Sequence, residues 1–116
     1  MSQLPKLVRD KVPDLIRGRG ATPHTRLLDG DSFYLRLLDK LREEVSELEL
    51  RPCAEELADV YEVLSALAFR LNIPLEEVEQ ERERKYRDRG GFQQGVLLED
   101  IDEPDESEQD ARRGLF

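Results

Sequence analysis

The segment Glu43–Asp59, EEVSELELRPCAEELAD, places acidic residues on both sides of a short break at Arg51-Pro52. The runs before and after the break have the apolar spacing of a helix, in which every third or fourth residue falls on one face. The first apolar stripe comprises Tyr34, Leu37, Leu38, Leu41, Val45 and Leu48, and the second comprises Cys53, Leu57, Val60, Val63, Leu64, Leu67 and Leu71. Because a short break suits an antiparallel pair, we expect two long helices, at about 33–50 and 53–71, that pack as a hairpin.

The acidic residues of this hairpin lie beside or inside its apolar stripes. At 100° per residue, Glu44 falls on the edge of the first stripe, and Glu47 and Glu43 fall progressively further round. Glu56 falls inside the second stripe, and Asp59 flanks it. An ionised carboxylate is costly to bury alone, and converging carboxylates attract hard cations that prefer oxygen ligands. We therefore predict a magnesium site, which Mn²⁺ could also fill, with the ligands Glu44, Glu47, Glu56 and Asp59.

A solvated or salt-bridged acidic face is the alternative to a metal site. Glutamate is common in helices, so a Glu-Glu-x-x-Glu motif is weak evidence by itself. The position of Glu56 favours the metal, because no lysine or arginine lies within one turn of it on the same helix.

The composition points to a single domain with a lean core. The chain has 116 residues, of which 39% are charged and 38% hydrophobic, with no tryptophan. A helical oligomer that shares its core suits such a chain, and we expect a homodimer or a dimer of dimers. The net charge of −9 argues against a nucleic acid polymer as a partner. Neither a signal peptide nor an apolar run of the roughly 18 residues that span a membrane is evident, so we expect a cytoplasmic protein with no membrane partner.

The rest of the chain adds shorter elements. A short helix should begin near Pro13 and end at Gly18 or Gly20, and a charged helix should run from Leu75 to about Arg89. The runs 25–28 and 95–98 could pair as one short two-stranded β ladder. We expect one all-α domain over residues 1–98, followed by an acidic, flexible tail over residues 99–116.

Basic residues near both ends of this domain could contact an anionic substrate. Arg9 and Lys11 precede the first short helix, and Lys85 and Arg89 lie at the end of the charged helix, just before Gly90-Gly91. For the first pair, spacing alone favours surface charge on a docked N-terminal arm. A basic helix end followed by two glycines is a suitable place for phosphate, and the solvated face of a dipole-matched helix is the alternative.

Three motifs in this order resemble the all-α nucleotide pyrophosphohydrolases of the MazG-like group, and within it the small phosphoribosyl-ATP pyrophosphohydrolase-like proteins. The motifs are Lys6-Leu7-Val8-Arg9-Asp10-Lys11-Val12-Pro13, the paired Glu43-Glu44-x-x-Glu47 and Glu56-x-x-Asp59, and Lys85-Tyr86-Arg87-Asp88-Arg89-Gly90-Gly91-Phe92. The resemblance implies a MazG-like helical bundle completed by oligomerisation, with Mg²⁺ held by the two acidic motifs. It also implies hydrolysis of a nucleoside triphosphate between the α- and β-phosphates, to a monophosphate and pyrophosphate.

The implied chemistry gives the remaining residues their roles. Glu43 or Glu47 could act as the general base on the attacking water. Arg9, Lys11, Lys85 and Arg89 could hold the phosphates. A phosphoribosyl-ATP pyrophosphohydrolase, a non-catalytic helical interaction module on the same scaffold, and a plain helical bundle with solubilising acids are the alternatives. Some members of the family remove non-standard nucleotides, and the base or sugar preferred here cannot be deduced from these motifs.

Overall fold

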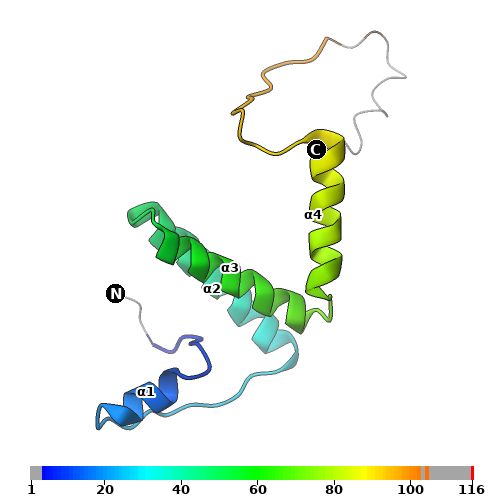
Figure 1. Cartoon of the computed structure of the whole chain (residues 1–116). Helices are drawn as coiled ribbons and strands as arrows, with labels where there is room; N and C mark the ends of the chain where they lie inside the picture. Colours follow the sequence, from blue (N-terminus) through cyan, green and yellow to red (C-terminus); the bar gives the residue numbers. More distant parts are fainter. Residues whose placement is uncertain (1–3, 103, 105–115) are drawn as a thin grey trace. The chain divides into compact units, whose positions relative to one another are not determined.

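The computed structural model describes residues 4–102, 104 and 116, and over these residues the chain is all-helical. The elements in chain order are α1 (Val12–Gly18), α2 (Gly30–Leu50), α3 (Ala54–Arg70) and α4 (Leu75–Arg89) (Figure 1). The predicted all-α class is therefore confirmed. By contacts the chain separates into two compact units, Met1–Leu75 and Glu76–Phe116. The predicted tail over residues 99–116 falls mostly outside the described residues, and the predicted domain limits stay a prediction.

The predicted β ladder between residues 25–28 and 95–98 is wrong. Neither segment forms a strand, and both are extended or irregular in the structure. Leu27 is fully exposed, and Val96 and Leu97 are also exposed, so neither run has a buried face. A two-stranded ladder without such a face is marginally stable in water, which explains why the short apolar runs do not pair.

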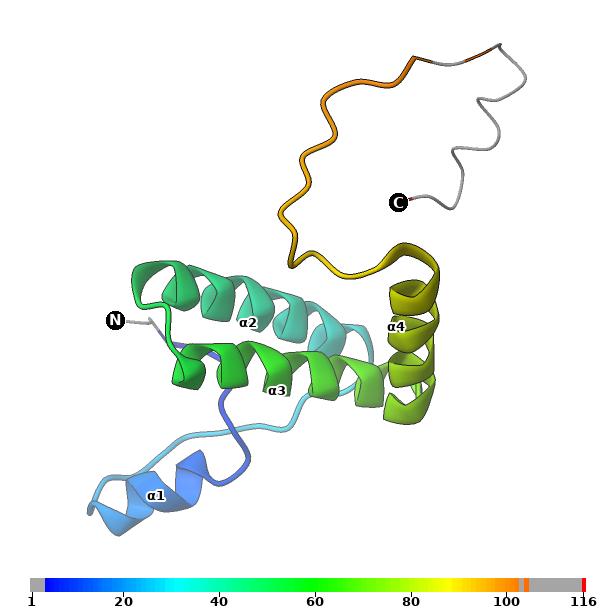
Figure 2. The ribbon, with the colours of Figure 1, turned by 45° about the horizontal axis from the view of Figure 1, so that its top comes forward.

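Helices α2 and α3 lie side by side and antiparallel, as Figure 2 shows. Their contact surface holds a small core of Leu37, Val63 and Leu67. Partly buried residues pack against this core: Leu7, Phe33, Tyr34, Leu38, Leu41 and Ala66. The predicted stripes are thus correct in the middle of the hairpin. On α3 the stripe is wider than the surface that α2 covers, because Leu57, Leu64 and Leu71 are about half exposed.

The ends of the hairpin follow local sequence rules. Helix α2 begins at Gly30, three residues before the predicted start, and Ser32 Oγ donates a hydrogen bond to the carbonyl of Asp29. Helix α3 ends before Asn72, whose φ of 59° is the left-handed conformation that asparagine tolerates at a helix end. Arg70 Nε donates to the carbonyl of Gly30 at 2.9 Å. This bond joins the end of α3 to the start of α2.

The segment before α1 packs against the hairpin. Leu7 contacts the core, Lys6 bonds Glu43 on α2, and Arg9 bonds Asp59 on α3. Helix α1 then begins with Pro13 in its first turn, as predicted, and residues 19–29 lead to α2. The apolar side chain of Leu7 therefore fixes where the basic residues on either side of it can reach.

Helix α4 has a different character and has no buried residue. Its first turn carries acids and its last turn bases, in agreement with the helix dipole, and Gly90, with a φ of 81°, follows its last residue. None of the four helices in the described ranges is both long enough and apolar enough to cross a membrane.

Candidate metal centre

Three of the four predicted metal ligands converge in the structure. One carboxylate oxygen from each of Glu44, Glu56 and Asp59 lies within 4.8 Å of the others. Glu44 comes from α2, whereas Glu56 and Asp59 are one turn apart on α3 and therefore share a face. Antiparallel packing of the two helices is what brings the acids together across the hairpin.

The surroundings of this cluster are partly desolvated. Glu44 and Glu56 are each only 8% exposed, and Asp59 is half-buried. The sequence argument that placed Glu56 inside an apolar stripe is therefore confirmed. Burial of two neighbouring carboxylates raises their mutual repulsion, because the effective dielectric constant is lower than in water. Their close approach requires positive charge nearby.

The donor set of the cluster fits a hard divalent cation. Carboxylate oxygens are the ligands that Mg²⁺ and Ca²⁺ prefer, and opposite oxygens around Mg²⁺ are about 4.2 Å apart. Adjacent oxygens around Mg²⁺ are about 3.0 Å apart. From the limit of 4.8 Å on their spread, the three oxygens would have to close by at most about 1.8 Å, a change that side-chain rotation can supply. Mg²⁺ usually retains several waters, so three carboxylates with open positions suit it.

Each carboxylate of the cluster already has one cationic partner. Lys40 Nζ lies 3.1 Å from Glu44 Oε1, Arg51 Nη2 lies 3.1 Å from Glu56 Oε1, and Arg9 Nη2 lies 2.7 Å from Asp59 Oδ1. The expectation that Glu56 lacks a compensating charge without a metal is therefore wrong. Its partner comes from the break between the helices and not from α3.

The ion pair between Arg51 and Glu56 affects the pKa of Arg51. The hydrogen bond to Glu56, helped by the nearby charges of Cys53 and Glu55, raises the pKa of Arg51 above its usual range. Arg51 also approaches Glu55 at 3.3 Å, and its side chain is 65% exposed. Because the Arg51 side chain is exposed to solvent, it could move away from Glu56 and leave that carboxylate available to a metal ion.

The predicted catalytic glutamates lie on α2 and are both half-buried. Glu43 accepts hydrogen bonds from Lys6 Nζ at 3.0 Å and from Lys40 Nζ at 3.4 Å. Glu47 is half-buried one turn further on, and it lies outside the group of three converging acids. Its roles as metal ligand and base stay predictions, as does the role of Glu43 as base.

The predicted phosphate-binding residues fall in both compact units. Arg9 reaches the cluster through Asp59, whereas Lys11 is exposed at the start of α1. Lys85 and Arg89 lie on α4, which belongs to the other compact unit. Within the unit Met1–Leu75, Arg9 is the predicted phosphate ligand that bonds one of the carboxylates.

Sequence reasoning missed Lys40, Arg51 and Lys6 as partners of the acidic residues. Lys40 carried a readable signal, because it lies four residues before Glu44 on one helix. Arg51 carried a weaker signal, since its reach depends on the turn that α2 makes at its end. Lys6 carried none, because its bond to Glu43 spans 37 positions.

Comparison with known proteins found similarity over part of the chain. No family model matches it, and no solved structure matches it. An uncharacterized protein from Mycolicibacterium smegmatis is 51% identical over 43 residues, which are 37% of this chain and 44% of that protein. The match thus spans less than half the length of that relative, whose description names no activity.

Proposed function

We propose that the chain is a Mg²⁺-dependent nucleotide pyrophosphohydrolase. It would cleave nucleoside triphosphates between the α- and β-phosphates, and removal of non-standard nucleotides is a role that suits this reaction. The observation that carries the proposal is the convergence of Glu44, Glu56 and Asp59 within 4.8 Å, with the first two buried. The resemblance of three motifs to the MazG-like group supplies the reaction, which the geometry alone does not specify.

The residues around the cluster have separable tasks in this mechanism. Glu44, Glu56 and Asp59 would hold Mg²⁺, which when bound would supply positive charge against the phosphates and the leaving pyrophosphate. Hydrolysis adds one water across the α–β anhydride bond, and Glu43 or Glu47 accepts the proton that this water loses. The water oxygen joins one phosphoryl group, and the bridging oxygen leaves with the other.

Arg9 can change its acceptor from Asp59 to a phosphate of the substrate. Its guanidinium bonds Asp59 at 2.7 Å and its side chain is 58% exposed. When Asp59 binds a metal, that carboxylate becomes a weaker acceptor for Arg9, and a phosphate oxygen can replace it. Arginine suits this exchange, because its planar fork binds phosphate through two parallel hydrogen bonds.

A helical interaction module is the second candidate function. Two observations favour it: the three cations that already compensate the cluster, and the exposed apolar residues of α3. In that case Lys40, Arg51 and Arg9 stabilise the hairpin by ordinary ion pairs, and the cluster has no use for a divalent ion.

The test is thermal unfolding of the parent and of Glu56→Gln, with and without Mg²⁺. A ligand that binds only the folded state raises stability by about 2.7 kcal/mol at a hundredfold excess over its Kd. The parent should gain this stability and Glu56→Gln should gain little. Glu62→Gln, at an exposed position of α3, should behave like the parent. Equal gains in all three proteins would remove Glu56 from the site.

A pyrophosphate-release assay decides the reaction and its substrate. The panel should contain the canonical, oxidised and deaminated nucleoside triphosphates together with phosphoribosyl-ATP. We expect Mg²⁺-dependent release from at least one of them, with Mn²⁺ as a partial substitute. Activity confined to phosphoribosyl-ATP would select the narrower enzyme. A protein that binds Mg²⁺ weakly and hydrolyses none of the panel would be the interaction module.

We also propose that the chain forms a homodimer or a dimer of dimers. Within the described residues no large side chain is fully buried, and α3 exposes Leu57, Tyr61, Leu64 and Phe69. Apolar residues at such density on one helix favour a helical partner. Light scattering at micromolar concentration should give a mass of at least twice 13.5 kDa. A monomer mass would remove the shared core from the proposal.

A further inference from the structure

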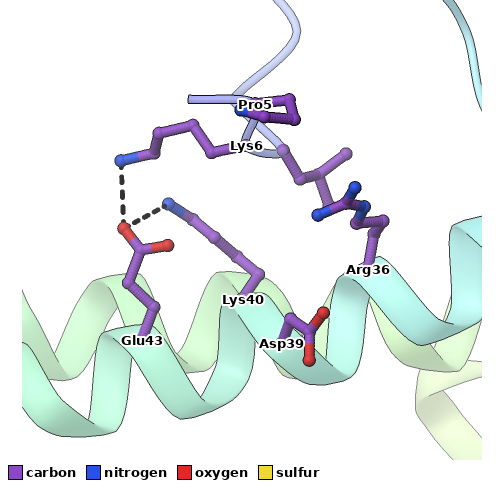
Figure 3. A pocket seen from close by; sticks show the side chains of 7 residues that line it. Pro5, Lys6, Arg36, Asp39, Lys40 and Glu43 are labelled. Carbon is purple, nitrogen blue, oxygen red and sulfur yellow. Dashed lines mark hydrogen bonds and ion pairs between the residues drawn. The ribbon is translucent and has the colours of Figure 1, made fainter. Parts of the chain in front are cut away.

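The chain has a second feature of interest beside the carboxylate cluster, and most of its residues have no role in the proposed mechanism. A cavity of about 380 Å³ lies between the N-terminal segment and α2 (Figure 3). Its lining comprises Pro5–Leu7 from the segment and Arg36, Asp39, Lys40 and Glu43 from α2. The volume lies near the lower end of the range for small-molecule sites. The cavity therefore suits a small polar group and not a whole nucleotide.

The lining concentrates positive charge in a chain with a net charge of −9. Lys6, Arg36 and Lys40 bring three cations, against the two anions Asp39 and Glu43. Asp39 also bonds Arg42 Nη1, at 3.2 Å, so its charge is partly compensated from outside the cavity. The local field in the cavity is therefore positive, and it favours an anion.

Arg36 is the residue that best indicates a ligand. It is half-buried, and within the described part of the chain its guanidinium has neither a hydrogen bond nor an ion pair. Figure 3 shows it on the α2 side of the cavity, facing the N-terminal segment. A guanidinium has five donors in a planar fork that matches phosphate oxygens. A phosphate in the cavity would satisfy donors that the protein leaves unused.

Lys40 connects this cavity with the candidate metal centre. Its Nζ lies 3.4 Å from Glu43 Oε1 in the cavity lining and 3.1 Å from Glu44 Oε1 in the carboxylate cluster. Lys6 approaches the same Glu43 oxygen at 3.0 Å. An anion in the cavity would therefore lie beside the metal centre, in competition with Glu43 for two lysines.

We propose that this cavity binds the pyrophosphate end of the nucleotide, while the bond to be cleaved lies at the carboxylate cluster. This inference rests on the proposed function, to which it adds a binding site for the leaving group. Lys6, Arg36 and Lys40 contact the two outer phosphates. The lysines exchange Glu43 for phosphate oxygens, and Arg36 donates to the phosphate from its guanidinium.

The test is calorimetric titration of the full chain with inorganic pyrophosphate in the presence of Mg²⁺. Because a hydrogen bond to a charged group is strong, Arg36→Ala should raise the Kd about ten- to a hundredfold. Arg36→Lys should restore part of the affinity, as it keeps the charge and loses the fork. Arg26→Ala removes the same charge at an exposed position outside the cavity lining, and its Kd should equal that of the parent. Circular dichroism of each variant checks that the helices remain.

Two outcomes overturn this inference. One is a parent that binds no pyrophosphate, and the other is an unchanged Kd in both Arg36→Ala and Lys6→Ala. The second variant removes a separate cation, so a local rearrangement around Arg36 cannot hide the result. Weaker pyrophosphate binding in Arg36→Ala, in a protein that hydrolyses no nucleotide, would support the cavity and remove the proposed function. Unchanged binding beside intact Mg²⁺-dependent hydrolysis would remove the cavity alone.

Discussion

The α2–α3 hairpin and α4 are both rich in acids, yet they compensate them in different ways. On α4, Arg82 bonds Glu79 and Arg84 bonds Glu81, each pair three residues apart. In the hairpin unit, Lys6 bonds Glu43 across 37 positions and Arg9 bonds Asp59 across 50. These two pairs of α4 lie within the helix itself, whereas two of the hairpin unit's ion pairs form only in the folded unit.

This difference separates a solvated helix from a candidate site. Local pairs on an exposed helix contribute little and need no other element. The acids of the hairpin lie against a core, converge from two helices and attract cations from three separate parts of the chain. Acid content therefore says little about function, and the position of each acid relative to an apolar face says more.

The largest expected effect is on hydrolysis. Glu44→Gln and Glu56→Gln remove ligands from the cluster, so we expect pyrophosphate release to fall by about a hundredfold or more. Glu79→Gln on α4 removes the same charge from a local pair and should leave the rate unchanged. Equal losses in all three variants, measured at saturating Mg²⁺, would contradict the contrast between the two regions.

The next effect concerns the apolar contacts. Leu67 is 8% exposed in the hairpin core, and Leu67→Ala should lower the free energy of unfolding by about 2–4 kcal/mol. Val78 on α4 is 46% exposed, and Val78→Ala should change it by about 0.5 kcal/mol or less. Urea unfolding followed by circular dichroism measures both. A large loss from Val78→Ala would show that α4 packs more closely than its exposure indicates.

A smaller effect tests whether Arg51 competes with Mg²⁺ for Glu56. Arg51→Ala should lower the melting temperature without Mg²⁺, because Glu56 loses its partner while it stays buried. The same change should lower the Kd for Mg²⁺ about fifteenfold, the effect of one unit charge on a divalent ion about 5 Å away in water. Arg17→Ala breaks an exposed pair with Asp14 and serves as the control. An unchanged Mg²⁺ affinity in Arg51→Ala would mean that Arg51 and the metal do not compete.

The smallest effect is the pH response of α4. Hydrogen bonds from Arg82 and Arg84 hold the pKa values of Glu79 and Glu81 below the usual 4.5. Because these folded-state pKa values are lowered, the stabilisation is complete above pH 4.5 and is lost as the pH falls through the lower values. Carboxyl NMR titration should show both shifts. In Arg82→Gln, the pKa of Glu79 should return toward 4.5 and that of Glu81 should stay low.

The sequence predicted the helices from local spacing, and it predicted the convergence of Glu44, Glu56 and Asp59 because a short break favours antiparallel packing. The apolar periodicity located α2 and α3 to within three residues, and it placed Glu56 in a buried position before any coordinates. The cation partners depend on tertiary structure, so Arg9 was predicted for phosphate and not for Asp59, and Arg51 was overlooked. The strand prediction for residues 25–28 and 95–98 failed because apolar runs of this length say nothing about whether another surface covers them.

The long separation of Arg9 and Asp59 along the sequence bears on the order of folding. Antiparallel helices joined by a three-residue connection make mostly local contacts, which form early because they close short loops. The Arg9 bond closes a loop of 50 positions, and each doubling of loop length costs about 0.6 kcal/mol more in closure entropy. We therefore expect the carboxylates of α2 and α3 to meet before the N-terminal segment docks. The acidic cluster would then exist for a time without Arg9 during folding.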